Sequence, residues 1–173
     1  MEESMHDILE RMESLIPEYS YSSISDIVKT DKKVKELLLS EMKQIKDYLF
    51  HIVQVSYELQ RDQLSDAAES SWDDVDSLVD RLENAKLFKF KGDKKSCDEC
   101  KKKVESELQN LIRRDRELVM EVRDLKRTVY LLYRALFDQG REKHFINSLG
   151  KIKKYVEEIS TLLDIRENII AGG

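Results

Sequence analysis

Two cysteines form the clearest candidate for chemistry in this chain. Cys97 and Cys100 are spaced as Cys-x-x-Cys at the start of a predicted helix, next to several lysines. A helix N-terminus and nearby cations favour a reactive thiolate, which serves redox or metal chemistry. A structural zinc ion needs four ligands, and no second Cys-x-x-Cys or nearby Cys/His pair is present. An intersubunit metal site with two thiolates from each chain of a dimer, a redox role and structural thiols therefore stay open.

Four carboxylates recur on one face of another predicted helix, namely Asp73, Asp76, Asp80 and Glu83. Such a row can bind a divalent cation or a basic partner, and it raises a metal-dependent hydrolase as the enzyme-class alternative. Carboxylates in a row along one helix do not converge on a point, however. A solvated or salt-bridged face is therefore the favoured interpretation.

No other pattern supports catalysis. Glu3-x-x-His6 matches one Glu-x-x-His pair of a di-iron site, but that site needs a second pair and two further glutamates. The three histidines are scattered, without a Ser/His/Asp grouping. The glycines are isolated apart from the C-terminal pair, so the sequence contains no phosphate-binding loop. We predict that the chain is not an enzyme and uses no cofactor.

A basic region extends over residues 86–127 and offers a nucleic-acid-binding alternative. Helix-borne cations can follow phosphates, with strong salt dependence. Glutamates and aspartates are interspersed on the same helix faces, and lysine and arginine stems also flank coiled-coil seams. The residues of this alternative are Lys89, Lys91, Lys94, Lys95, Lys101, Lys102, Lys103, Arg113 and Arg114.

The strongest pattern is a row of ten positions at alternating steps of four and three, which is typical of a coiled-coil seam. Its members are Val104, Leu108, Leu111, Asp115, Leu118, Val122, Leu125, Val129, Leu132 and Leu136. We interpret this row, the heptad seam, as an interaction seam for a protein partner.

Asp115 is the one charged member of the heptad seam. A lone buried carboxylate is costly, so Asp115 needs a partner from another helix or a locally open seam. We interpret Asp115, together with Ser56 in a similar row on an earlier helix, as marks that fix register and oligomeric state. Replacing Asp115 with Leu is then expected to raise the melting temperature and to scramble the assembly.

Five helices are predicted to position these residues. The first covers residues 2–16 and ends before Pro17, and Thr30 or Asp31 is expected to cap the second. The second helix continues to Leu59, and its apolar face is widened by Leu37, Tyr48, Phe50, Val53, Val55 and Tyr57. The third begins at Ser70 or Ser71. The fourth is capped by Ser96 and stops at Gly140, and the fifth carries Phe145 to Ile170.

These elements predict an all-α fold, an elongated antiparallel helical bundle or coiled coil. We expect an N-terminal helix and connector over 1–23, an acidic helical hairpin over 24–91 and a long basic coiled-coil hairpin over 92–173. The loop at 86–96, with Phe88 and Phe90 between lysines, is the expected hairpin tip, which either closes the bundle end or contacts a membrane surface or bases.

The length of the fourth helix predicts that the chain binds a partner. About 42 helical residues extend roughly 63 Å, whereas a compact chain of this size is only about 40 Å across. The other helices cover part of its seam, and each uncovered Leu or Val forfeits roughly 1.5–3 kcal/mol. We therefore expect a second copy or another protein to cover the remainder.

Composition and charge agree with this interpretation. The 173 residues are 40% apolar and 38% charged, with no apolar run long enough to span a bilayer, so we expect an intracellular protein, cytoplasmic or nuclear. Residues 1–85 carry a net charge of −11 and residues 86–173 one of +6. We predict a coiled-coil interaction or scaffolding protein that forms a homodimer or joins a helical complex, with opposed charge setting the orientation.

Overall fold

A computed structural model describes the chain over residues 3–86, 98–137 and 142–171. Its elements are five α-helices, and no strand occurs in the described ranges, which confirms the all-α prediction. None of the described helices has the length and hydropathy needed to cross a membrane. The helices are α1 (Met5–Leu15), α2 (Ile24–Glu58), α3 (Asp62–Asn84), α4 (Asp98–Ala135) and α5 (Glu142–Ile170).

The first two helices are separated by a connector of eight residues. α1 begins after Ser4, whose Oγ accepts a hydrogen bond from the backbone N–H of Asp7 at 3.2 Å. The predicted cap of α2 is wrong, because α2 is continuous from Ile24 and both Thr30 and Asp31 lie inside it. Ser23 accepts the capping bond from the backbone N–H of Asp26 instead, at 3.2 Å.

The third helix also starts earlier than predicted. α3 begins at Asp62 and not at Ser70 or Ser71, directly after a tight turn in which Gln60 has a φ of 55°. Leu64 and Ala68 are buried, so the apolar stripe already runs through this first part of α3. Ser71 lies mid-helix and donates its hydroxyl to the carbonyl of Ala67 at 3.1 Å.

The long fourth helix is unbroken. α4 continues for 38 residues without a kink-forming residue, and α5 for 29 residues. At about 1.5 Å per residue, α4 alone is roughly 57 Å long. The predicted cap Ser96 and the hairpin tip with Phe88 and Phe90 lie outside the described residues.

The chain divides into two compact units. Unit 1 contains residues 1–37, 86–119 and 162–173, and unit 2 contains residues 38–85 and 120–161. The predicted division of the chain at residues 23 and 91 follows consecutive segments, and it stays a prediction.

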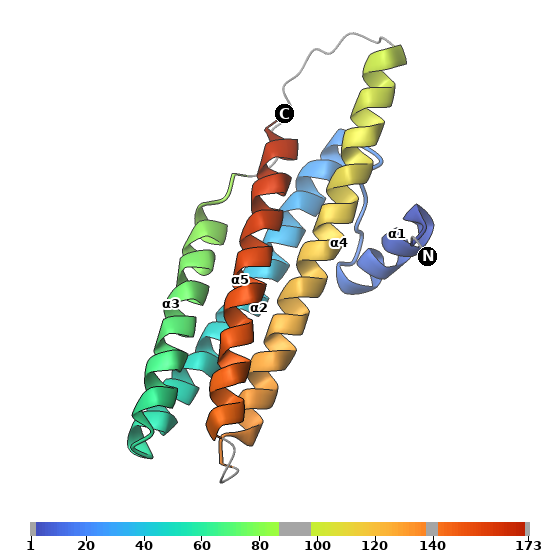
Figure 1. Cartoon of the computed structure of the whole chain (residues 1–173). Helices are drawn as coiled ribbons and strands as arrows, with labels where there is room; N and C mark the ends of the chain where they lie inside the picture. The colour runs from blue at the N-terminus through green and yellow to red at the C-terminus, as the bar shows by residue number, and fades with distance from the viewer. Residues whose placement is uncertain (1–2, 87–97, 138–141, 172–173) are drawn as a thin grey trace. The chain divides into compact units, whose positions relative to one another are not determined.

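Unit 2 is a bundle of four helical stretches, from α2, α3, α4 and α5 (Figure 1). α2 and α3 form an antiparallel hairpin, since Lys43 pairs with Glu83 and Lys46 with Asp76. On its other side α2 meets α4, where Glu41 pairs with Lys126 at 2.8 Å. α3 meets α5 where Arg81 donates to the Ser160 carbonyl at 3.2 Å. The order around the bundle is therefore α2, α3, α5, α4.

Unit 1 combines α1 and its connector with one end each of α2, α4 and α5. The apolar face of α1 is buried through Ile8 and Met12, and the following Ile16 is buried as well. Glu3 links this N-terminal segment to α4 through an ion pair with Arg116 at 2.8 Å. Unit 1 also buries several polar side chains, and the charged ones among them interact with one another.

Candidate functional site

The buried seam carboxylate Asp115 has three hydrogen-bond donors. Nε of Arg166 on α5 donates to its Oδ1 at 2.6 Å. The hydroxyls of Tyr19 and Tyr21 both donate to its Oδ2, at 3.0 Å and 2.5 Å. The predicted need for a partner from another helix is confirmed, and that partner is Arg166.

Arg166 joins a second buried carboxylate to the first. Its Nη2 donates to Oδ1 of Asp31 on α2, and both side chains are almost fully buried. Burial opposes the charge of Arg166, but the carboxylates of Asp115 and Asp31 outweigh it and raise the pKa of the guanidinium above its ordinary value. We call these residues the Asp115 cluster: Tyr19, Tyr21, Asp31, Asp115 and Arg166.

The two tyrosines belong to the connector between α1 and α2. Their rings pack edge to face with centroids 5.3 Å apart. Burial, followed by the charge of Asp115, raises the pKa of both Tyr19 and Tyr21, so they stay protonated and donate. Thr30 holds the same connector by donating its hydroxyl to the Ser20 carbonyl at 2.7 Å.

This arrangement is suited to holding helices together and not to reacting with a substrate. Both oxygens of Asp115 accept from protein donors, and the tyrosine hydroxyls point at a carboxylate inside the unit. Removing one partner of such a buried network leaves an uncompensated charge, which costs about 3–5 kcal/mol. The Asp115 cluster therefore fixes the connector, α2, α4 and α5 of unit 1 in one register.

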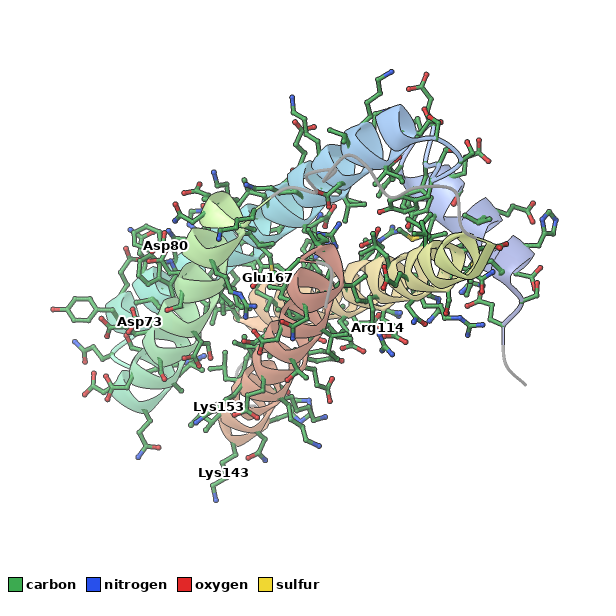
Figure 2. All side chains as sticks on the ribbon, turned by 90° about the horizontal axis from the view of Figure 1, so that it is seen from above. Asp73, Asp80, Arg114, Lys143, Lys153 and Glu167 are labelled. Carbon is green, nitrogen blue, oxygen red and sulfur yellow. The ribbon has the colours of Figure 1, made fainter. Side chains whose placement is uncertain are left out.

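The acidic face of α3 is partly salt-bridged, as predicted. Glu83 pairs with Lys43 at 2.6 Å, and Asp76 pairs with Lys46, whose Nζ also lies 4.9 Å from the Trp72 ring centroid. Asp73 and Asp80 are exposed and extend from the outer side of α3 (Figure 2). Across the described ranges, no group of three or more potential metal ligands comes together.

The heptad seam is largely filled by the chain itself. Val104 is 40% exposed and Leu108 is half-buried, whereas the remaining positions are buried. Those buried positions are Leu111, Asp115, Leu118, Val122, Leu125, Val129, Leu132 and Leu136. A partner that binds this chain has to use other surfaces along most of α4.

Several large apolar side chains of unit 2 are exposed instead. Phe50 is 48% and Tyr57 75% exposed on α2, so the prediction that they widen the buried face is wrong. Leu131, in the last part of α4, is 56% exposed, and Phe137, in the turn after α4, is 67% exposed. The spacing of these exposed apolar residues is similar to that of core residues. A helix face next to the buried seam can also be rich in apolar residues, so spacing alone does not distinguish the two.

Of the residues predicted for nucleic-acid binding or for a thiolate metal site, Arg113 and Arg114 are the ones whose side chains the structure describes. Arg113 and Arg114 are half-buried, and Arg114 pairs with Glu117 on the same helix. Lys89, Lys91, Lys94, Lys95 and Cys97 lie outside the described residues, as do the side chains of Lys101, Lys102, Lys103 and Cys100. The metal, redox and nucleic-acid interpretations that use them stay predictions.

Comparisons with protein-family models, with curated proteins and with solved structures find no match to this chain. Function is therefore inferred from the molecule itself. The Asp115 cluster stabilises unit 1, whereas unit 2 presents an exposed apolar and charged surface to a partner.

Proposed function

We propose that this chain is a non-enzymatic interaction or scaffolding protein that dimerises or serves as a subunit of a helical complex. The single observation that carries the proposal is the set of exposed apolar side chains on unit 2, which includes Phe50, Tyr57, Leu131 and Phe137. Burying one such side chain fully contributes roughly 1.5–3 kcal/mol. An intracellular location, cytoplasmic or nuclear, belongs to the same proposal.

The filled heptad seam narrows where a partner binds. From Leu111 to Leu136 the seam positions are buried within the chain, so a coiled-coil contact through them requires the bundle to open. A contact through the outer faces of unit 2 does not require the bundle to open. We therefore assign the interaction to these outer faces, and at most to the Val104 end of the seam.

Charge on unit 2 supports oriented binding. The outer side of α3 carries the exposed carboxylates Asp62, Asp66, Glu69, Asp73 and Asp80, whereas the last part of α4 carries the exposed cations Arg123, Arg127 and Arg134. Separated charges of opposite sign steer a partner and fix its orientation more than they add affinity.

Two described cations of the basic region already have carboxylate partners within the chain, which weakens the nucleic-acid alternative. Arg114 has Glu117 as its ion-pair partner and Arg116 has Glu3. It is tested by titrating salt against binding to DNA and RNA, where phosphate contacts give a steep salt dependence.

The test of the proposal compares tagged wild-type protein with the variant Phe50→Glu/Tyr57→Glu in the native cell. The proposal expects a protein that co-purifies stoichiometrically with the wild type and is lost from the variant. The matched control Asn147→Glu, at an exposed position on α5, is expected to keep that protein. Equal recovery with all three chains, or recovery of nucleic acid alone, would contradict the proposal.

A further inference from the structure

We infer that a second copy of this chain docks on the outer face of α2 in unit 2, with the two α2 helices parallel and a two-fold axis running along them. This inference rests on the proposed function, and it names the partner and the geometry of the contact.

The outer face of α2 carries a second regular row. Lys43, Asp47, Phe50, Gln54 and Tyr57 follow one another at alternating steps of four and three, and all five are exposed. The buried row of α2, which includes Met42, Ile45, Leu49, Ile52 and Ser56, lies on the opposite side of the helix. The exposed row thus presents two aromatic rings, Phe50 and Tyr57, that are seven residues apart. A seven-residue repeat keeps both rings on one side of the helix, where the equivalent rings of a parallel helix can meet them.

α2 lies between an acidic and a basic neighbour. On one side, Lys43 and Lys46 reach Glu83 and Asp76 of α3. On the other side, the Tyr48 ring lies 5.5 Å from Tyr130 of α4, and Glu41 pairs with Lys126. The outer face of α2 is therefore bordered by the carboxylates of α3 and by the arginines of α4.

The bordering charges occupy matching heights along α2. The pairs between α2 and α3 place Asp80 level with the Lys43–Lys46 segment and Asp73 level with the region of Phe50. The contacts between α2 and α4 place Arg127 and Arg134 at the same two heights. Both pairs are seven residues apart, so Asp80 corresponds to Arg127 and Asp73 to Arg134.

Symmetry then selects the parallel arrangement. With the two-fold axis along the helices, the α3 border of each copy meets the α4 border of the other, so carboxylates face guanidinium groups twice at equal heights. With the axis across the helices, α3 meets α3 and α4 meets α4, and like charges face each other. Like-charge contacts are strongly unfavourable in an interface, and the bordering charges of α3 and α4 are self-complementary only in the first arrangement.

A second basic surface, on α5, is the competing one. Lys143 and Lys153 extend from α5 on the other side of α3 (Figure 2), and Lys151 and Lys154 are exposed there as well. No large apolar side chain of α5 within unit 2 is among the exposed ones, whereas Phe50 and Tyr57 are. We therefore place the contact on α2 and make docking through α5 an outcome of the test.

The first experiment reverses the charges in two variants. Asp73→Lys/Asp80→Lys and Arg127→Glu/Arg134→Glu are each expected to weaken the homodimer by at least about 100-fold. Mixing the two variants is expected to restore dimerisation, because each contact then pairs opposite charges again. Size-exclusion chromatography with light scattering measures the mass, and thermal unfolding shows that each variant is folded.

Matched controls carry the same charge changes on α5. Glu157→Lys/Glu158→Lys and Lys151→Glu/Lys154→Glu alter exposed positions and are expected to leave dimerisation unchanged. If Lys151→Glu/Lys154→Glu weakens the dimer and Arg127→Glu/Arg134→Glu does not, the contact lies on α5 and the inference fails. Failure of the mixed variants to associate contradicts it equally.

The second experiment tests the parallel orientation. In a chain with Cys97→Ser and Cys100→Ser, Gln54→Cys is expected to form a disulfide between equivalent residues on mild oxidation, since residues beside the two-fold axis come within disulfide range. Asn147→Cys on α5 is the control and is expected to stay reduced. A dimer in which Gln54→Cys does not cross-link contradicts the geometry and leaves the proposed function standing. A wild-type chain that is monomeric overturns this inference, while co-purification of a different protein still decides the proposed function.

Discussion

Arg166 and Asp115, which are 51 residues apart in the sequence, join α5 to α4 through a bond of 2.6 Å between Nε and Oδ1. Each of the two residues occupies a place in an otherwise apolar row of its helix. The same guanidinium reaches Asp31 on α2, so three helices of unit 1 share one buried cation. The network specifies how these helices align, because a shift of one turn along any of them leaves charges unpaired.

Replacing Asp115 with Leu is expected to lower the free energy of unfolding by about 3–5 kcal/mol. The substitution removes the acceptor of Tyr19 and Tyr21 and takes one of two carboxylates from Arg166, so the direction is opposite to that expected from the sequence. Asp124→Leu changes an exposed carboxylate of the same helix and is expected to have an effect within about 0.5 kcal/mol. Urea unfolding measures both, and a more stable Asp115→Leu variant would show that the cluster does not hold unit 1 together.

Alkaline pH is expected to destabilise the protein through Tyr19 and Tyr21. Their pKa values are raised in the folded chain by burial and by Asp115, so the unfolded chain loses these protons first as the pH rises past about 10. The free energy of unfolding then falls by up to about 2.7 kcal/mol per pH unit.

The variant Tyr19→Phe/Tyr21→Phe provides the comparison. It is expected to be less stable at pH 8, because Asp115 loses two donors, and to have a much shallower decline between pH 10 and pH 11. Tyr155→Phe on α5, which removes a tyrosine hydroxyl outside the Asp115 cluster, is the control variant. Parallel stability curves for the double variant and the wild type would exclude these two hydroxyls as the titrating groups.

The sequence predicts the helices well and the cluster only in part. Asp115 stands out as a charge in an apolar seam, and Arg166 interrupts the corresponding row of α5, so both carry a readable signal. Asp31 does not, since aspartate after threonine is also typical of a helix cap. Tyr19 and Tyr21 lie in a connector, where no periodicity indicates which side chains turn inward.

The exposed pair of Lys43 and Glu83 is expected to contribute far less than the buried cluster. Glu83→Gln is expected to change the free energy of unfolding only slightly, because water and salt screen a pair at the surface. The change is expected to vanish at 1 M salt, where the Debye length is only about 3 Å and the attraction between exposed charges is screened. A loss as large as that of Asp115→Leu would contradict the difference in burial between the two sites.

The side chains of the heptad seam differ in burial, so truncating them is expected to lower the free energy of unfolding by different amounts. Leu125→Ala removes a fully buried side chain and is expected to cost about 2–5 kcal/mol, whereas Val104→Ala is expected to cost less than about 0.5 kcal/mol. Denaturant unfolding of the two variants measures the difference. Similar losses would indicate that Val104 is covered in solution.

The outer face of α2 shows why the candidate interaction surface was not predicted from the sequence. Phe50 and Tyr57 are apolar and helically spaced, so their pattern alone does not separate an outer row from the core. The neighbours decide it: α3 and α4 flank α2 and leave this row uncovered. Which helices become neighbours depends on tertiary contacts that periodicity does not encode.

The most direct test of association is the mass of the purified protein by sedimentation equilibrium over a range of micromolar concentrations. The account predicts a mass that rises to twice the 20.4 kDa of one chain, and a shift toward one chain mass for Phe50→Glu/Tyr57→Glu. A mass of 20.4 kDa at every concentration, with no protein bound by the wild type in its native cell, would contradict it.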